Sequence, residues 1–196
     1  DFNGTDSFTF SVSDGDLSDE ASVTITIDAV NDAPVLATVS DVSFDEDDSG
    51  STTLSASDVD GDNLIFNILG GTNITATLDG SDVSFSAPDN YNGSETFTIT
   101  VTDGSESDSQ NITVTVNAVN DAPVLASIGD RVINEDGELN VLLSAFDVEG
   151  DQLSYSITNG INITASLSAN DLTLTPNQDF NGSETFTVTV TDGDLE

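Results

Sequence analysis

The sequence predicts an all-β fold in which similar sandwich modules follow one another along the chain. Apolar residues recur at every second position over most of its length, as in Phe97, Ile99 and Val101, which alternate with threonines. Such alternation is typical of antiparallel strands with one buried face, and no segment shows helical spacing. The six residues Val30–Val35, VNDAPV, also return 89 residues later as Val119–Val124. A repeat of this length indicates tandem copies of one structural unit.

The repeat divides the chain into parts, because its two copies align without a gap and half of the aligned positions are identical. We expect residues 30–118 to form one complete module and residues 119–196 a module that lacks its last strand. Residues 1–29 match the end of a module, since Asp1–Ser18 resembles Asp179–Glu196. The chain contains no methionine, and we expect it to be a segment of a longer array.

Within the complete module, turn signals such as Asp60-Gly61, Asp79-Gly80 and Asn92-Gly93 separate seven expected strands. Seven antiparallel strands in roughly 90 residues are typical of a Greek-key sandwich of the immunoglobulin type. Their inward-facing Phe, Ile, Val and Leu residues would fill the core between two sheets. The expected strands lie near Val42–Phe44, Thr52–Ser57, Leu64–Leu69, Ile74–Leu78, Val83–Ser86, Glu95–Thr102 and Gln110–Asn117.

The charge of the chain excludes several functions. It contains 37 Asp and Glu residues against a single Arg131, with no His, so its formal net charge is −36. Such a chain cannot neutralise phosphates, which excludes nucleic acid as a partner. It has no Cys, which excludes disulfides and thiolate chemistry. No apolar run approaches the roughly 20 residues of a membrane span, so we expect no membrane insertion in this segment.

The acidic residues gather in turns and at the module junctions. The loop Asp58-Val59-Asp60-Gly61-Asp62 places three carboxylates at a strand end, and it returns as Asp147-Val148-Glu149-Gly150-Asp151. Hard oxygen donors at this spacing suit Ca²⁺, whereas zinc prefers nitrogen and sulfur donors. The loop is not an EF-hand, because its glycine stands at the fourth position and no helices flank it. Two alternatives are an ordinary solvated turn and a salt-adapted acidic surface.

The linkers form the second acidic cluster, Asp28-Ala29-Val30-Asn31-Asp32-Ala33-Pro34-Val35 and Asn117-Ala118-Val119-Asn120-Asp121-Ala122-Pro123-Val124. Together with the acidic loop, Glu46 and the strand-end Asp103-Gly104, they resemble the bacterial cadherin-like tandem repeats, of the VNDAPV type, of large surface proteins and adhesins. The resemblance covers the whole chain. The Asp-Arg-Glu motif of cadherins is absent, so one or two ions per junction are implied rather than three. Asp103-Gly104 could also be only a hairpin turn.

The resemblance implies that Ca²⁺ binds between successive modules, with ligands from both modules and from the linker. Glu135 occupies in its module the place that Glu46 has in the preceding one, and it is a candidate metal ligand as well. The implied ligands at the first junction are Asp28, Asn31, Asp32, Asp58, Asp60 and Asp103, and Asp62 of the acidic loop is a further candidate. Those at the second are Glu46, Asn117, Asn120, Asp121, Asp147, Glu149 and Asp192, and Asp151 of the second acidic loop is a further candidate.

The expected function is that of a non-enzymatic extracellular spacer, secreted or on a bacterial cell surface, in a large surface protein, adhesin or filament. Ca²⁺ would stiffen each junction, so the expected partners are calcium ions and the neighbouring repeats of the same chain. The alternatives are an adhesive module that binds glycan or a copy of itself, and a subunit of a self-assembling filament. An enzyme is not expected, because His, Cys and Lys are absent and the carboxylates lie in exposed turns where no pocket is implied.

Overall fold

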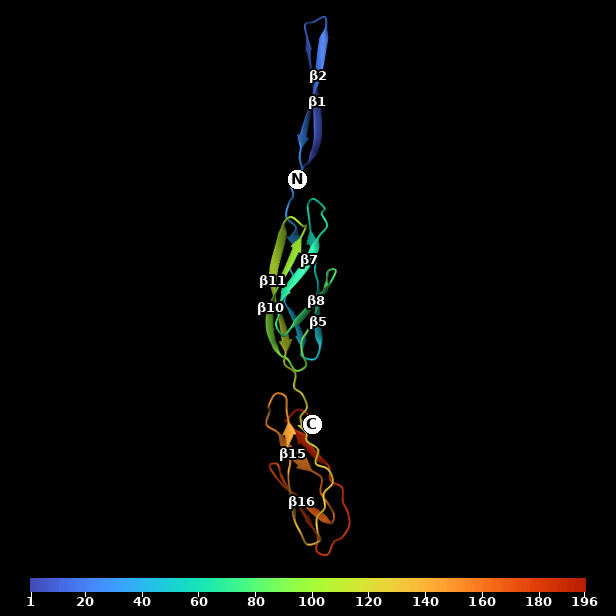
Figure 1. The fold of residues 1–196 in the computed structure, drawn as a ribbon, viewed down its shortest axis with the longest axis vertical. Helices are drawn as coiled ribbons and strands as arrows, with labels where there is room; N and C mark the ends of the chain where they lie inside the picture. The colour runs from blue at the N-terminus through green and yellow to red at the C-terminus, as the bar shows by residue number, and fades with distance from the viewer. The chain divides into compact units, whose positions relative to one another are not determined.

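The computed structural model describes all of residues 1–196 and consists of strands and turns without a helix. The prediction of an all-β fold is therefore confirmed (Figure 1). Contacts within the chain define two compact units, Asp1–Ala118 and Val119–Glu196. No helix is present that is long and apolar enough to cross a membrane.

The first strands form a hairpin. β1 (Gly4–Ser13) and β2 (Ser18–Ile27) pair antiparallel along their full length. Their alternate residues are apolar, yet Phe8 and Phe10 are each 54% exposed and Ile25 is 50% exposed. A two-stranded ribbon has no second sheet to cover its apolar face. Within residues 1–196 the apolar face of the hairpin is therefore uncovered.

Residues 30–118 form a sandwich of two main sheets. One has the strand order β4-β11-β10-β7 and the other the order β5-β9-β8. In the first sheet β11 pairs antiparallel with β10 and parallel with β4, so it lies between them. The short strands β3 and β6 form an additional antiparallel pair. The bounds are β3 Val35–Leu36, β4 Val42–Asp45, β5 Ser49–Thr53, β6 Ala56–Ser57, β7 Ile65–Gly70, β8 Thr75–Asp79, β9 Asp82–Ser86, β10 Gly93–Thr102 and β11 Ser107–Asn117.

These strands agree with the expected ones to within a few residues, with one exception. The prediction of a single strand over Thr52–Ser57 is wrong, because β5 and β6 are separate strands in different sheets. Between them the Leu54 N–H donates to the Ser81 carbonyl at 2.8 Å. The following strand, β6, pairs with β3. The strand β3 was not expected either, since two residues carry no visible alternation.

The core of this sandwich lies between the sheets. Ile99, Val101 and Val114 are fully buried and alternate with the polar residues of β10 and β11, as the period of two predicts. The rings of Phe85 and Phe97 meet edge to face with their centroids 5.3 Å apart. Burial of each such side chain stabilises the fold by about 1.5–3 kcal/mol.

The second unit repeats part of this sandwich. Its strands form one sheet in the order β13-β17-β16 and the pairs β12–β14 and β15–β18. The buried core consists of Val141, Leu143 and Leu172 with partly buried neighbours. No strand of this unit corresponds to β11, and residues 131–134, which correspond to β4, form no strand. The bounds are β12 Val124–Leu125, β13 Leu139–Leu142, β14 Ala145–Phe146, β15 Ser154–Ile157, β16 Ile163–Ser168, β17 Asp171–Pro176 and β18 Val188–Thr191.

Candidate metal centre

The acidic loop of the first unit is folded around Asp58. Its Oδ1 accepts hydrogen bonds from the backbone N–H groups of Asp60 at 2.9 Å and Asp62 at 3.2 Å. One carboxylate oxygen from each of these three residues lies within 4.8 Å of the others. The second oxygen of Asp58, Oδ2, is buried and has no hydrogen-bond partner. The loop therefore holds three carboxylates close together with one buried oxygen left free for a ligand.

The linker lies against this loop. Asp60 Oδ2 accepts a hydrogen bond from the Asp32 backbone N–H at 2.8 Å. The adjacent Asn31 donates from Nδ2 to Asp103 Oδ2 at 2.9 Å. The structure thus brings together linker, loop and strand-end residues that are 28 and 72 positions apart in the sequence.

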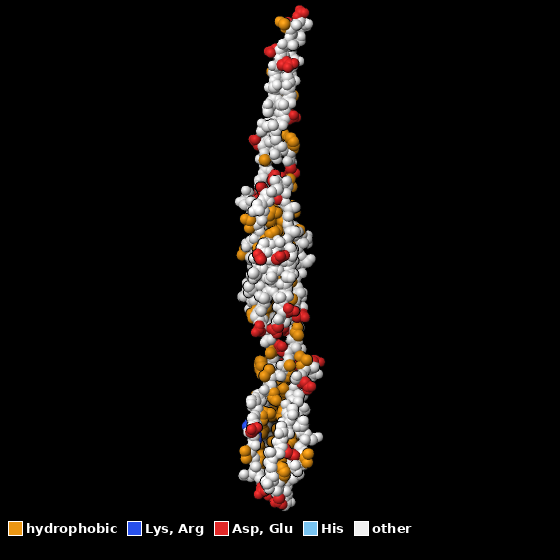
Figure 2. Space-filling view, turned by 90° about the vertical axis from the view of Figure 1, so that its right-hand side faces the viewer, with side chains coloured by type: hydrophobic (Ala, Val, Ile, Leu, Met, Phe, Trp, Pro, Cys, Tyr) orange, Lys and Arg blue, Asp and Glu red, His pale blue; other side chains and the backbone are white.

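Asp28 lies close to the same group. It lines a cavity of about 260 Å³ together with Asn3, Asp32 and Asp60. Figure 2 shows acidic side chains near the ends of the sandwich of residues 30–118, and others about half-way along it. All the residues implied for the first junction therefore lie around the linker or in the loop that contacts it.

Asp103 has two roles in the structure. Its Oδ1 accepts hydrogen bonds from the N–H groups of Ser105 at 2.6 Å and Glu106 at 2.7 Å and so closes the turn after β10. Its Oδ2 faces Asn31. The Glu106 N–H, followed by Asn31 and the Ser105 N–H, lowers the pKa of Asp103. Asp103 is therefore an ionised turn residue and also part of the linker cluster.

The second unit repeats this arrangement. Asn120 donates to Asp192 Oδ2 at 2.8 Å, and the Asp121 N–H donates to Glu149 Oε2 at 3.3 Å. The N–H of Leu195, followed by the Asn120 side chain, lowers the pKa of Asp192. The equivalent contacts in both units show that the linker cluster is a property of the repeat.

The acidic loop of the second unit differs in one respect. Asp147 Oδ1 accepts hydrogen bonds from the N–H groups of Gly150 and Asp151, each at 3.0 Å. The three acids of this loop do not approach one another as closely as those of the first loop do. The longer Glu149 stands where the first loop has Asp60, which is consistent with a wider loop.

Buried carboxylate oxygens test whether these residues fit a cation. Asp147 is only 6% exposed, and its Oδ2 has no hydrogen-bond partner. Asp58 Oδ2 and Asp121 Oδ2 are also buried oxygen atoms without a hydrogen-bond partner. A buried polar group without a partner costs roughly 1–3 kcal/mol, and a divalent cation would supply the missing partner. Because all the atoms that could ligate a metal here are oxygens, the residues fit Ca²⁺.

The remaining implied ligands lie elsewhere. Glu46 is buried at 5% exposure, and its N–H donates to the Asn117 carbonyl at 2.9 Å. Asn117 in turn donates from Nδ2 to Asp45 Oδ1 at 3.0 Å. These residues form a polar group at the end of β4 and β11 in the first unit. Glu135 is exposed in the second unit. That any of them binds calcium stays a prediction.

Two carboxylate clamps were not predicted from the sequence. Glu95 accepts hydrogen bonds from the N–H groups of Thr72 at 2.7 Å, Asn73 at 3.0 Å and Ile74 at 3.1 Å. Glu184 holds residues 161–163 in the same way. The Asn73 N–H contributes most to lowering the pKa of Glu95. The available signal was a lone acid in a strand of threonines, repeated within NGSETF.

Comparisons with known proteins identify a family and several similar chains. A family model described as "Bacterial Ig domain" matches residues 31–115 and 120–196. Chitinase A of Pseudoalteromonas piscicida is 35% identical over 105 residues, which are 52% of this chain and 13% of that protein. Human protocadherin-24 EC1-2, in crystal form II, matches with a TM-score of 0.51 at 18% identity over 82% of this chain and 95% of that chain. The endo-fucoidan hydrolase MfFcnA4, from glycoside hydrolase family 107, matches with a TM-score of 0.37 at 21% identity over 99% of this chain and 32% of that chain.

Proposed function

Because this chain belongs to the bacterial Ig domain family, we propose that it is a non-enzymatic, calcium-stiffened spacer of an extracellular protein. The observation that carries the proposal is the contact of the linker with the acidic loop. Asp32 is hydrogen-bonded to Asp60, and the buried Asp58 Oδ2 in the same loop has no partner. The fold likeness to protocadherin-24 EC1-2 agrees with a string of such modules.

Electrostatics explains why the linker needs a cation. Two carboxylates about 4 Å apart repel each other by about 1 kcal/mol in water and about 4 kcal/mol near a protein surface. The chain has one Arg and no Lys or His to offset this repulsion. A calcium ion supplies two positive charges where these carboxylates converge. Asp58, Asp60 and Asp62 would hold it, with linker residues Asp28 and Asp32 beside them.

Stiffness follows from fixing the part of the linker that packing leaves free. Pro34 is fully buried and Leu36 is 8% exposed, so the end of the linker is already anchored in the sandwich. The preceding residues Asn31 and Asp32 are held only by polar contacts with acidic side chains. Calcium would bind these acids together, and the chain would then leave the module in one direction.

The alternative of a glycan-binding module has less support. Sugar-binding surfaces commonly present aromatic side chains, and this chain has no Trp. Tyr91 and Tyr155 both pack against the cores of their units. The match to Chitinase A spans 13% of that protein, and we propose for this chain the place of a spacer beside a catalytic or adhesive domain.

Small-angle X-ray scattering of the whole chain tests the spacer role. We expect a larger radius of gyration in calcium than in excess EGTA, because a flexible linker shortens the average end-to-end distance. The loop variant D58N/D60N should lose much of this response. The control variant D79N/D89N removes the same charge from exposed positions of the same unit and should keep it. Identical scattering of the unsubstituted chain in calcium and in EGTA would contradict the proposal.

A further inference from the structure

The first and last strands of the sheet that contains β4 and β11 are neighbours and run in the same direction. β4 pairs parallel with β11, with Val42–Asp45 set against Val114–Asn117. In a parallel pair, the start of one strand lies at the opposite end from the finish of the other. The chain therefore enters this ladder at one end and leaves it at the other. Figure 1 shows that it also enters and leaves the sandwich at opposite ends.

The contact between the entering chain and β11 begins well before β4. Asp108 Oδ2 accepts a hydrogen bond from the Leu36 N–H at 2.9 Å. Asp41 Oδ1 accepts one from the Thr113 N–H at 2.7 Å. Both bonds join residues that are 72 positions apart, which is also the spacing of the partners in β4 and β11. Residues 36–45 thus follow β11 in a single register.

Gln110 takes the place of a neighbouring strand in the middle of this segment. Val39 is only 7% exposed, and its N–H donates to Gln110 Oε1 at 3.1 Å. Gln110 Nε2 in turn donates to the Val39 carbonyl at 2.6 Å. A side-chain amide offers the same acceptor and donor as a peptide group. Because buried backbone groups need partners, this side chain fixes the entering segment to β11 where backbone pairing is absent.

Polar contacts also close the far end of the ladder. The Glu46 N–H donates to the Asn117 carbonyl at 2.9 Å, and Asn117 Nδ2 donates to Asp45 Oδ1 at 3.0 Å. The bonds therefore run from Leu36 and Asp108 at the entry to Glu46 and Asn117 at the exit. The pairing of the entering chain with the other sheet is shorter, because β3 and β6 are joined through two residue pairs.

We propose that residues 30–118 form a tension-bearing module, in which Asp108 and Gln110 extend the stressed ladder beyond β4. Tension along the chain pulls residues 36–46 toward one end of the module and β11 toward the other. The two segments are then sheared, and their bonds resist together instead of breaking one after another. This role goes beyond a calcium-stiffened junction, because every bond of the ladder joins two protein groups and needs no cation.

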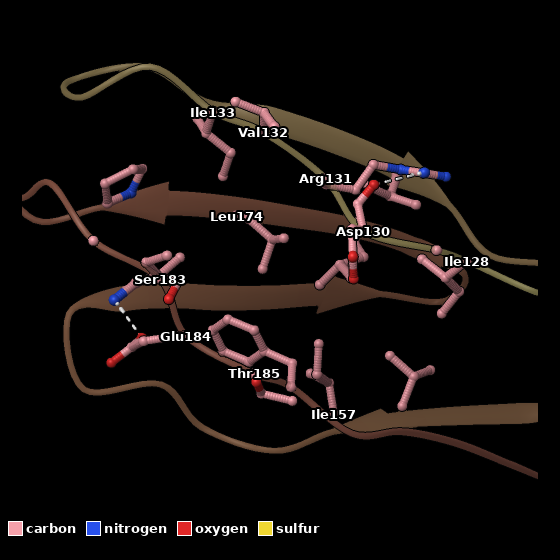
Figure 3. Close-up of a pocket in the computed structure, with 18 of the residues that line it drawn as sticks. Ile128, Asp130, Arg131, Val132, Ile133, Ile157, Leu174, Ser183, Glu184 and Thr185 are labelled. Carbon is pink, nitrogen blue, oxygen red and sulfur yellow. Dashed lines mark hydrogen bonds between the residues drawn. The ribbon is translucent and has the colours of Figure 1, made fainter.

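The ladder belongs to the complete copy of the repeat. The 89-residue spacing puts the counterpart of β11 at Glu196 and beyond. The counterparts of Asp41–Phe44 are Asp130–Ile133, which form no strand and line the pocket that Figure 3 shows. All the bonds on which the proposal rests therefore lie within residues 30–118, where both strands are present.

Single-molecule force spectroscopy of the whole chain tests the proposal, and the absence of Cys allows thiol handles to be placed at chosen exposed positions. V30C/A118C holds the module beyond both ends of the ladder and loads it in shear. V30C/S109C shares one handle but holds β11 beside Asp108, so the same force peels the ladder open. We expect the lifetime under constant force to be at least about tenfold longer in shear. Equal lifetimes in the two directions would overturn the proposal.

Replacement of Gln110 by Ala in the V30C/A118C chain tests the side-chain part of the ladder. Loss of the two bonds to Val39 should shorten the lifetime in shear by about tenfold. The control Thr53→Ala removes a 2.8 Å bond to Asp82 between β5 and β9, outside the ladder, and should change the lifetime much less. Equal effects of the two substitutions would refute the role of Gln110. The comparison of the two pulling directions stands even where Gln110→Ala fails to fold.

Measurements in calcium and in EGTA separate this proposal from the calcium-stiffened spacer. We expect the dependence on pulling direction to be the same in both conditions, because the ladder contains no cation. A dependence that is present in calcium and lost in EGTA would overturn the proposal and would support calcium as the element that resists tension.

Discussion

Asn31 donates a hydrogen bond from Nδ2 to Asp103 Oδ2 at 2.9 Å, and Asn120 makes the same bond to Asp192 at 2.8 Å. In each unit this bond joins a linker residue to a residue 72 positions later in the sequence, in the turn that follows a strand. The amide is uncharged, so it contacts the carboxylate without adding to the repulsion among the acids. This contact positions the linker over the acidic loop.

Replacement of Asn31 by Ala should release the linker from this turn. The pKa of Asp103 is lowered most by the Glu106 N–H and next by Asn31. The variant should therefore raise the pKa of Asp103 while leaving it below its ordinary value. Carbon-detected NMR titration measures this change directly. Asn63→Ala is the control, because Asn63 is an exposed residue near the same loop. An unchanged Asp103 pKa in the Asn31 variant would show that the bond is absent in solution.

Replacement of Glu95 by Gln should make stability less dependent on pH. The backbone amides of residues 72–74 lower the pKa of Glu95 below its ordinary 4.5. A lowered pKa contributes stability above the unfolded-state value and loses it as pH falls through the folded-state value. The free energy of unfolding of the unsubstituted chain should exceed that of the variant most at neutral pH. This difference should become smaller below pH 4.5. Urea unfolding at several pH values measures it.

The control for this experiment is Glu106→Gln, which removes an exposed carboxylate from the same unit. General relief of acid repulsion at low pH affects both variants alike. An equal pH dependence of the two variants would therefore argue against the clamp.

Replacement of Gly71 by Ala should destabilise the first unit by more than about 2 kcal/mol. Gly71 has φ +78°, and a Cβ there would lie 2.7 Å from the ring of Phe97. Gly80 has φ +63° with open space around it, so Gly80→Ala should cost only the left-handed strain of about 1–2 kcal/mol. Urea unfolding compares the two, and equal losses would mean that the sandwich relaxes around the added methyl group.

Replacement of Asp147 by Asn should change stability in opposite directions with and without calcium. In EGTA the variant replaces a buried carboxylate that has no cation beside it by a neutral amide, whose oxygen can still accept from the N–H groups of Gly150 and Asp151, and we expect the variant to be the more stable chain. In calcium it should weaken binding and reduce the ligand-linked stabilisation. Thermal unfolding in both conditions measures the reversal. Asp151→Asn, an exposed position in the same loop, should show a smaller effect, and the same sign in both conditions for Asp147→Asn would exclude it as a ligand.

Much of this fold follows from local patterns. The alternation in Phe97, Ile99 and Val101 predicts their burial, because side chains on a strand point to opposite faces. The approach of Asn31 to Asp103 also follows, since the repeat places linker and strand end at the same end of a sandwich. The clamp of Glu95 was missed because its partners are backbone N–H groups of another loop, which leave no mark in the sequence. The division of β5 from β6 depends on a change of sheet that only the tertiary fold defines.

The strands of the second unit were only partly foreseen. The 89-residue repeat puts the counterpart of β11 at Glu196 and beyond, so the prediction for residues 119–196 contains no such strand. Residues 131–134 form no strand, whereas their counterpart in the first unit, β4, pairs with β11.

Isothermal titration calorimetry of calcium into the whole chain tests the central claim most directly. We expect saturable binding to the unsubstituted chain and to the control variant D79N/D89N. The loop variant D58N/D60N should lose the site of the first unit and keep that of the second, where Asp147 and Asp121 remain intact. Equal affinity and equal numbers of bound ions in all three proteins would contradict the assignment of calcium to this loop.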